Sequence, residues 1–357
     1  MGNIIRGCLV LAMLTELVVV CPPGALAADT DKPVVKVKPK PIPEIPFFTF
    51  IDDRLTYSYV FNVADAGFFT PKAGGGYNGT GDEQVLAFTH FDTWEYGTNF
   101  LNVGLYKTGH DEGANPCGGT LPIGNCAGHT DIYGQIRSTL GFNQIFDTHA
   151  FSWGPLHNVS LEVGGDADAS NSYLASAVLK GFAGLQFAFD LPYKGFLNIA
   201  PLYKTEQAHN SFTQCGDIFA SPAPACNFDG VEHYNDTWAV EVNYSMDLGF
   251  LPETIQYFNI SGRVGIYGPK GPTYGIAGNE PTKTEINSEP VRITFDAGKA
   301  IWGKKYTHEV DYWVAYRYWK NEFGYNDQSA PFVCTQFGVS TNSCTASYYA
   351  TGITVKF

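Results

Sequence analysis

Residues 347–357, SYYATGITVKF, show the pattern on which the predicted fold depends. One face of their two-residue period is aromatic or β-branched: Tyr349, Thr351, Ile353, Val355 and Phe357. The other face is small or polar: Tyr348, Ala350, Gly352, Thr354 and Lys356. This alternation predicts a β-strand with one apolar face. Because the ends of soluble domains commonly fray, an apolar strand here favours a larger sheet with its apolar face toward lipid.

The first 27 residues have the pattern of a secretory signal peptide. Arg6 precedes the apolar run CLVLAMLTELVVV, and Ala25-Leu26-Ala27 is a cleavage signal of the A-x-A type. A lipoprotein signal ending at Cys21 is the alternative, but the residue before that cysteine is not small. We therefore expect residues 1–27 to be removed on export.

Residues 28–46, ADTDKPVVKVKPKPIPEIP, are rich in Pro and Lys without periodicity, which predicts an extended periplasmic arm. The remaining residues, 47–357, are expected to form one domain. The chain has 21 Tyr, 26 Phe and 39 Gly and only 16% charged residues, a composition that favours strands and turns. A net charge of −13 argues against a nucleic-acid partner, because binding phosphates requires a basic surface.

Alternating runs of about ten residues fill the domain and are separated by turns. Runs of this length suit tilted transmembrane strands. We predict twelve strands: 53–64, 83–94, 99–108, 130–143, 154–165, 174–190, 195–207, 236–249, 254–267, 287–297, 308–321 and 347–357.

The connections between these runs alternate in length, with short ones such as EYGT at 95–98 and LPYKG at 191–195. Short periplasmic turns and long outer loops are typical of outer-membrane barrels. The predicted fold is therefore all-β: a closed antiparallel transmembrane β-barrel of about twelve strands in the bacterial outer membrane. The bilayer is accordingly an expected partner.

Six cysteines remain after signal removal, and they form three local pairs: Cys117 with Cys126, Cys215 with Cys226, and Cys334 with Cys344. An exported chain with closely spaced cysteine pairs favours disulfides. All three pairs fall in predicted outer loops. Their spacings are not those of zinc sites, so we expect neither a metal nor another cofactor.

The faces of the strands follow from the cost of charge in lipid, about 2–4 kcal/mol for Arg or Lys at mid-bilayer. In EVDYWVAYRYWKN, residues 309–321, Tyr312 and Val314 fall on the apolar face, whereas Arg317 falls on the charged one. The charged parity must face the lumen. On this basis we predict these pore-lining residues: Asp92, Arg137, Tyr257, Arg263, Asp311, Trp313, Arg317 and Trp319.

The chain resembles the nucleoside-specific channel-forming outer-membrane proteins (the Tsx family) from about Leu55 to Phe357. Three stretches carry the resemblance: QVLAFTHFDTWEYGTNFLNVGLYKT (84–108), YWVAYRYWKNEFGYND (312–327) and the strand that ends in Phe357. The resemblance implies passive diffusion of nucleosides past aromatic and ionisable side chains. It also implies that Arg317 and Trp319 line the path. Separately, the strand that ends in Phe357 resembles the recognition signal of outer-membrane barrels, so the assembly machinery is an expected partner.

Two other functions remain open. A lipid hydrolase on a barrel scaffold would need a serine and a histidine together on the lipid-facing wall. His157 and Ser160 lie three residues apart, on opposite faces of one strand, and His90 is another candidate base. A structural barrel with a closed lumen is the second alternative, because opposite charges in the interior can simply pair. We expect a channel, not an enzyme.

Overall fold

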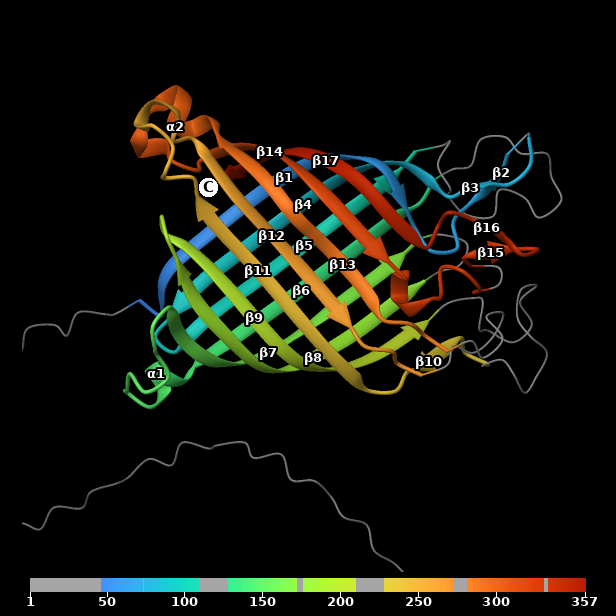
Figure 1. The fold of residues 1–357 in the computed structure, drawn as a ribbon, viewed down its shortest axis with the longest axis horizontal. Helices are drawn as coiled ribbons and strands as arrows, with labels where there is room; N and C mark the ends of the chain where they lie inside the picture. The colour runs from blue at the N-terminus through green and yellow to red at the C-terminus, as the bar shows by residue number, and fades with distance from the viewer. Residues whose placement is uncertain are drawn as a thin grey trace, which may run out of the picture. The chain divides into compact units, whose positions relative to one another are not determined.

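The computed structural model describes residues 46–72, 74–109, 128–171, 176–209, 228–271, 281–330 and 333–357. The predicted signal peptide and nearly all of the predicted arm lie outside these residues. Within residues 46–357, long antiparallel strands form one closed sheet (Figure 1). Around the barrel they are β1 (Phe48–Ala64), β4 (Thr80–Trp94), β5 (Gly97–Thr108), β6 (Thr130–Gly141), β7 (Leu156–Ser170), β8 (Ala177–Leu191), β9 (Gly195–His209), β11 (Thr237–Asp247), β12 (Phe258–Tyr267), β13 (Glu285–Asp296), β14 (Val310–Lys320) and β17 (Thr345–Lys356).

The seam of the barrel is the pairing of β17 with β1. Ile353 lies opposite Tyr57 and Val355 lies opposite Leu55, while the other edge of β17 pairs with β14. The backbone N–H of Phe357 continues this ladder by donating to the carbonyl oxygen of Asp53 at 3.1 Å. The predicted closure is confirmed, and all twelve predicted strands are present among the described residues.

The outer face of the barrel is apolar and exposed. On β14, Val314 is 46% exposed, whereas its neighbours Trp313 and Ala315 are 5% and 4% exposed and point inward. Other exposed apolar side chains lie on strands around the barrel: Leu55, Tyr57, Leu86, Leu105, Ile132, Ile136, Leu179, Tyr203, Trp238, Ile293 and Ile353. Such a belt is stable in contact with lipid and not with water. The chain therefore forms a membrane-spanning barrel of the outer-membrane type.

The two ends of the barrel differ, as Figure 1 shows. One end carries α1 and α2, and the other carries β2, β3, β10, β15 and β16. The bounds of these short elements are α1 (Phe142–Ile145), α2 (Ala297–Trp302), η1 (Glu253–Ile255), η3 (Lys304–Tyr306), η4 (Glu322–Gly324), β2 (Thr70–Pro71), β3 (Tyr77–Asn78), β10 (Val231–His233), β15 (Thr335–Gln336) and β16 (Val339–Ser340). No helix among the described residues is long and apolar enough to cross a membrane.

Two connections at the periplasmic end are longer than the predicted short turns. The connection after β6 contains α1, and rings of Phe142, Phe146 and Phe151 pack together there. The connection after β13 contains α2, which Asp296 caps by accepting a hydrogen bond from the backbone N–H of Lys299 at 2.8 Å. Local packing and helix capping stabilise these segments. The alternation of apolar residues along strands cannot predict either feature.

The disulfide between Cys334 and Cys344 is present and lies in the outer loop between β14 and β17. The half-cystines pack with buried Ala330 and Val333. The predicted pairs Cys117–Cys126 and Cys215–Cys226 lie outside the described residues. A cross-link within one loop limits the conformations of that loop, which suits a segment that folds back over the barrel mouth.

The orientation of the strands can be tested with one substitution at two positions of similar exposure. Val314 on the outer face is 46% exposed, and Val339 in the β15–β16 hairpin is 49% exposed. We expect Val314→Arg to lower the free energy of unfolding in lipid bilayers by about 2–4 kcal/mol. Val339→Arg should change it by less than about 0.5 kcal/mol. Equal effects of the two substitutions would contradict a lipid-facing β14.

Candidate functional site

A cavity of about 130 Å³ lies in the half of the lumen toward the outer loops. Its acidic side chains come from one arc of the barrel, which runs from the residue after β1 through β4 and β6 to β7: Asp65, Glu83, Asp131, Asp166 and Asp168. Its basic side chains come from the rest of the wall, β8 to β14: Lys180, which is the cross-strand neighbour of Asp166, and Arg263 and Arg317 farther around the barrel. Facing arcs of opposite charge create an electric field across the lumen.

The three basic side chains of the cavity form no ion pair with a carboxylate among the described residues. The ammonium group of Lys180 lies 5.6 Å from the ring centre of Tyr267 and 5.7 Å from that of Phe323. Arg317 donates one hydrogen bond, to the Asn287 side chain at 3.2 Å. These cations therefore keep donors available for a solute.

Aromatic rings make up much of the remaining wall: Tyr106, Tyr133, Tyr267, Trp319, Phe323 and Tyr348. The indole N–H of Trp319 donates to Glu285 at 2.9 Å, which fixes the ring on the lumenal side of β14. Phe323 comes from the connection after β14 and not from a strand. Its backbone is in the left-handed region (φ 53°), and its ring centre lies 5.3 Å from that of Trp319. The outer loop thus contributes a ring to the cavity.

The floor of the cavity is an ion network around Arg137. The guanidinium donates to both carboxylate oxygens of Glu241, at 2.6 and 3.0 Å, and to Asp166 at 2.8 Å. The Tyr267 hydroxyl donates to the same Glu241 at 3.2 Å, and the Phe182 ring centre lies 4.3 Å from the guanidinium carbon. Because β6 and β11 are separated by three strands, the pair of Arg137 and Glu241 spans part of the lumen.

The outer end of the lumen is narrowed by loops that bond to one another. Glu322, which is fully buried, accepts a hydrogen bond from the backbone N–H of Ala66 at 3.0 Å. Burial raises the pKa of Glu322 well above its ordinary value, which favours the neutral acid. Asn342 donates to the Tyr77 carbonyl oxygen at 3.3 Å. The loop after β1 and the loop after β14 are therefore held together at the outer end of the barrel, where the two strands flank β17.

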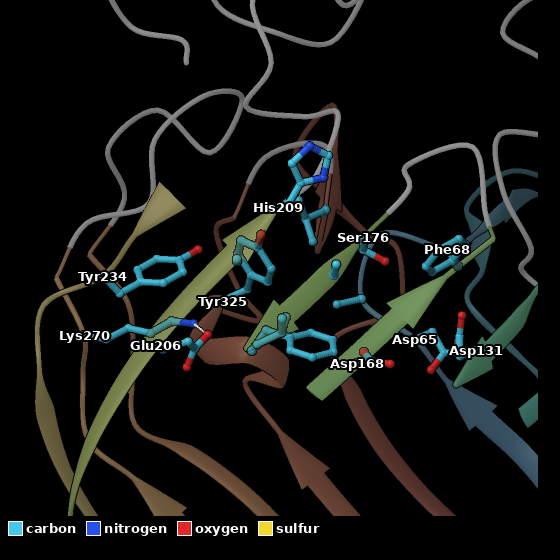
Figure 2. A pocket seen from close by; sticks show the side chains of 16 residues that line it. Asp65, Phe68, Asp131, Asp168, Ser176, Glu206, His209, Tyr234, Lys270 and Tyr325 are labelled. Atoms are coloured by element: carbon cyan, nitrogen blue, oxygen red, sulfur yellow. Dashed lines mark hydrogen bonds and ion pairs between the residues drawn. The ribbon is translucent and has the colours of Figure 1, made fainter. Parts of the chain in front are cut away.

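A second, smaller cavity of about 70 Å³ adjoins the first, since both are lined by Asp65, Asp131 and Asp168 (Figure 2). At its far side the ammonium group of Lys270 contacts Glu206. Glu206 also pairs with Lys204 at 2.6 Å. Glu206 therefore pairs with two lysines, whereas the cations of the first cavity form no ion pair among the described residues.

Seven of the eight predicted pore residues occupy four places. Arg263, Arg317 and Trp319 line the outer cavity, and Arg137 forms its floor. Tyr257 lines a cavity of about 300 Å³ at the periplasmic end. Asp311 and Trp313 are buried in the periplasmic half of the lumen, where His308 lies 3.1 Å from Asp311 and Arg292 lies 4.0 Å from the ring centre of Trp313.

Asp92 was predicted to line the pore, but it does not point into the lumen. β4 pairs with β5 without a register shift, so Asp92 shares the outward parity of Leu86. It accepts hydrogen bonds from Asn99 at 2.9 Å and lies 3.0 Å from the His90 ring, which contacts Asp53 at 2.6 Å. Asp92 is 3% exposed, so these partners bury its carboxylate on the outer side of the sheet, and the rule that charge faces inward fails at this position.

Several cavity residues are absent from the predicted pore set. Glu83 shares the inward parity of Val85 on β4, and both are 6% exposed, so extending the alternation to the strand end could have found it. Asp65 and Phe323 lie in loops, where no periodic signal exists. Their places depend on contacts between loops distant in sequence.

No family model matches the chain, and no curated protein matches it. An outer membrane channel from Pseudomonas putida F1 is similar in structure, with a TM-score of 0.44 and 9% sequence identity over 87% of this chain and 98% of that one. LpxR from Salmonella typhimurium has a TM-score of 0.37 and 11% identity over 85% of this chain and 100% of that one. The TodX deltaS2S3 mutant monoaromatic hydrocarbon channel has a TM-score of 0.34 and 7% identity over 86% and 90%. All three TM-scores lie below 0.5, so function has to be inferred from this chain's own residues.

Removing Arg137 tests the network at the cavity floor. Arg137→Met leaves Glu241 and Asp166 without their shared cation, so we expect the free energy of unfolding to fall by about 3–5 kcal/mol. The control is Arg54→Met: the Arg54 side chain is 36% exposed, and its partner Asp52 keeps Lys356 at 2.9 Å. That change should cost less than about 1 kcal/mol. Denaturant unfolding in lipid vesicles measures both, and similar losses would contradict a bridged lumen.

Proposed function

We propose that the protein is a passive outer-membrane channel for small polar solutes, and that nucleosides are the class its lumen suits best. The observation that supports this most is the cavity in which Lys180, Arg263 and Arg317 face an acidic arc without pairing with it. Charges that serve only to close a lumen pair with one another, as Arg137 does with Glu241. Donors left without such partners are suited to a passing solute.

The aromatic wall adds a preference for flat solutes. Trp319, Tyr348 and Phe323 line the same cavity as Arg317. Aromatic rings stack on flat heterocycles, and guanidinium groups donate directional hydrogen bonds to ring nitrogens and carbonyl oxygens. The acidic arc provides acceptors for ribose hydroxyls and exocyclic amines. A nucleoside presents one flat base and one hydroxyl-rich sugar, and so uses both arcs.

The geometry supports a channel over a lipid hydrolase. On the outer wall, both ring nitrogens of His90 contact carboxylates, those of Asp53 and Asp92. The nearby Ser138 hydroxyl donates to Asn99 at 2.7 Å and not to a histidine. His157 contacts Asp190 at 3.3 Å and is 61% exposed, whereas Ser160 is 5% exposed on the opposite parity of β7. The Ser152 hydroxyl donates to the backbone carbonyl oxygen of His157 at 2.6 Å and not to its ring. Neither the His90 ring nor the His157 ring contacts a serine hydroxyl of the described residues, so these two histidines do not provide the base that a serine nucleophile needs.

Passage through the barrel also requires assembly in the membrane. Phe357 is 73% exposed, and its ring lies beside Phe88 on the outer face. The proposal therefore includes export with loss of residues 1–27 and recognition of this exposed aromatic strand end by the outer-membrane assembly machinery. Residues 28–46 would then remain as a periplasmic arm.

Ion selectivity in planar bilayers tests the two arcs. We expect discrete conductance steps from the wild-type barrel. Asp168→Asn removes a negative charge from the acidic arc and should shift the reversal potential toward anion selectivity, while Arg263→Gln removes a positive charge and should shift it oppositely. A folded barrel without conductance steps would contradict the channel, and shifts of one sign would contradict the facing arcs.

Nucleoside preference is tested by block of that conductance. We expect nucleosides to reduce the current more than sugars or amino acids do, and Trp319→Leu to weaken the block by about tenfold, the effect of losing one base–aromatic stack of about 1–3 kcal/mol. Trp238→Leu is the matched control, because Trp238 is 50% exposed on the lipid face of β11. If nucleosides, sugars and amino acids all reduced the current equally, the preference for nucleosides would be contradicted.

A further inference from the structure

Four potential metal ligands converge at the outer end of the lumen. They are Asp65, which follows β1, Glu83 on β4, and His129 and Asp131 at the start of β6. One ligand atom from each lies within 4.8 Å of those of the others. Figure 2 shows Asp65 and Asp131 side by side at the edge of the smaller cavity, below Phe68. Residues distant in sequence are thus brought to one point by the closed barrel.

The cluster contains more negative charge than its surroundings neutralise. Asp65 and Asp131 each contact the Nε2 atom of His129, at 3.2 and 3.1 Å. Glu83 is 6% exposed, yet among the described residues its carboxylate forms no ion pair, and no hydrogen bond reaches it. No lysine or arginine of the described residues forms an ion pair with any of these three carboxylates. An unpaired buried carboxylate is costly, and a cation at the centre of the cluster would offset that cost.

The imidazole of His129 is held in one orientation. Its Nδ1 atom lies 3.2 Å from the hydroxyl oxygen of Thr108, and its ring stacks on Phe68 with the centres 4.6 Å apart. The backbone N–H of His129 donates to the same hydroxyl at 2.8 Å. A histidine that binds a metal through one nitrogen is typically fixed by a hydrogen bond at the other. Nε2 therefore points at the carboxylates and its ring cannot easily turn away.

The spacing of the donors suits a small cation. Ligands about 2.0–2.2 Å from a zinc ion at the corners of a tetrahedron lie about 3.3–3.6 Å apart. The two measured separations at Nε2, 3.1 and 3.2 Å, are close to that edge length. The separations between the other donors, including those to Glu83, are at most 4.8 Å.

We propose that Asp65, Glu83, His129 and Asp131 bind a divalent transition-metal ion of the zinc type. One imidazole nitrogen and three carboxylate oxygens match borderline ions such as Zn²⁺ better than Ca²⁺, which takes six to eight oxygen ligands. The bound ion replaces the proton between His129 and its carboxylates. It ties the loop after β1 to β4 and β6, and it neutralises part of the acidic arc. The site does not require that the barrel conduct.

Calorimetric titration of the full chain in detergent with Zn²⁺ tests the site. We expect one ion per barrel, and at least a tenfold loss of affinity in Glu83→Gln and in His129→Gln. Asp168→Asn is the matched control, because Asp168 lines the same cavity but is not one of the four ligands; its affinity should equal that of the wild type. Ca²⁺ should bind at least tenfold more weakly than Zn²⁺.

Two further measurements apply if a ligand variant fails to fold. X-ray absorption of the zinc-loaded wild-type barrel should show nitrogen and oxygen ligands and no sulfur, which separates this site from the cysteines. Thr108→Val keeps all four ligands but removes the hydrogen bond at Nδ1, and should weaken binding about 10–100-fold. Affinity unchanged in all three variants, sulfur in the first shell, or equal affinity for Ca²⁺ would overturn the proposal.

Discussion

The pairing of β17 with β1 is the constraint on which the rest of the structure depends. In lipid no water can satisfy an open strand edge, so the sheet has to close. Closure fixes the parity of every strand, which places Val314 toward lipid and Trp313 toward the lumen. It also brings Arg137 on β6 within reach of Glu241 on β11. The arrangement of charged side chains in the lumen therefore follows from the need to hydrogen-bond every strand edge.

Within the closed lumen, charge is used in two ways. Arg137 is surrounded by carboxylates and joins opposite strands, so it mainly shapes the floor of the cavity. Arg263 and Arg317 line the cavity above that floor without a carboxylate partner among the described residues. Arginine thus bridges part of the lumen at one level and offers free hydrogen-bond donors to solutes at the next. This contrast underlies the proposed channel.

The sequence predicts the barrel well because alternation is a property of each strand alone. The parity of residues 309–321 is enough to place Trp313, Arg317 and Trp319 inside. Asp92 shows the limit of that rule: its carboxylate is buried with His90 and Asn99 on the outer side of the sheet. A sequence rule that sorts faces by charge cannot identify a charge that such partners bury.

The positions of loop residues cannot be predicted from the sequence, for a different reason. Phe323 reaches the cavity through a left-handed backbone, and Asp65 approaches His129 through the side-by-side pairing of β1, β4, β5 and β6. The spacing of cysteines argued against a metal at those residues, but it contains no information about a cluster of four side chains from three separate segments. Solute-binding and metal-binding hypotheses therefore need the three-dimensional arrangement, whereas the barrel itself does not.

Liposome swelling with the purified barrel tests the central claim most directly, because it measures passage of uncharged solutes and not of ions. Vesicles containing the protein are diluted into isotonic solutions of a nucleoside, a disaccharide or an amino acid. We expect the vesicles to swell quickly in the nucleoside solution and more slowly in the other two. A correctly folded barrel that gives no swelling with any solute would contradict a channel and favour a barrel with a closed lumen.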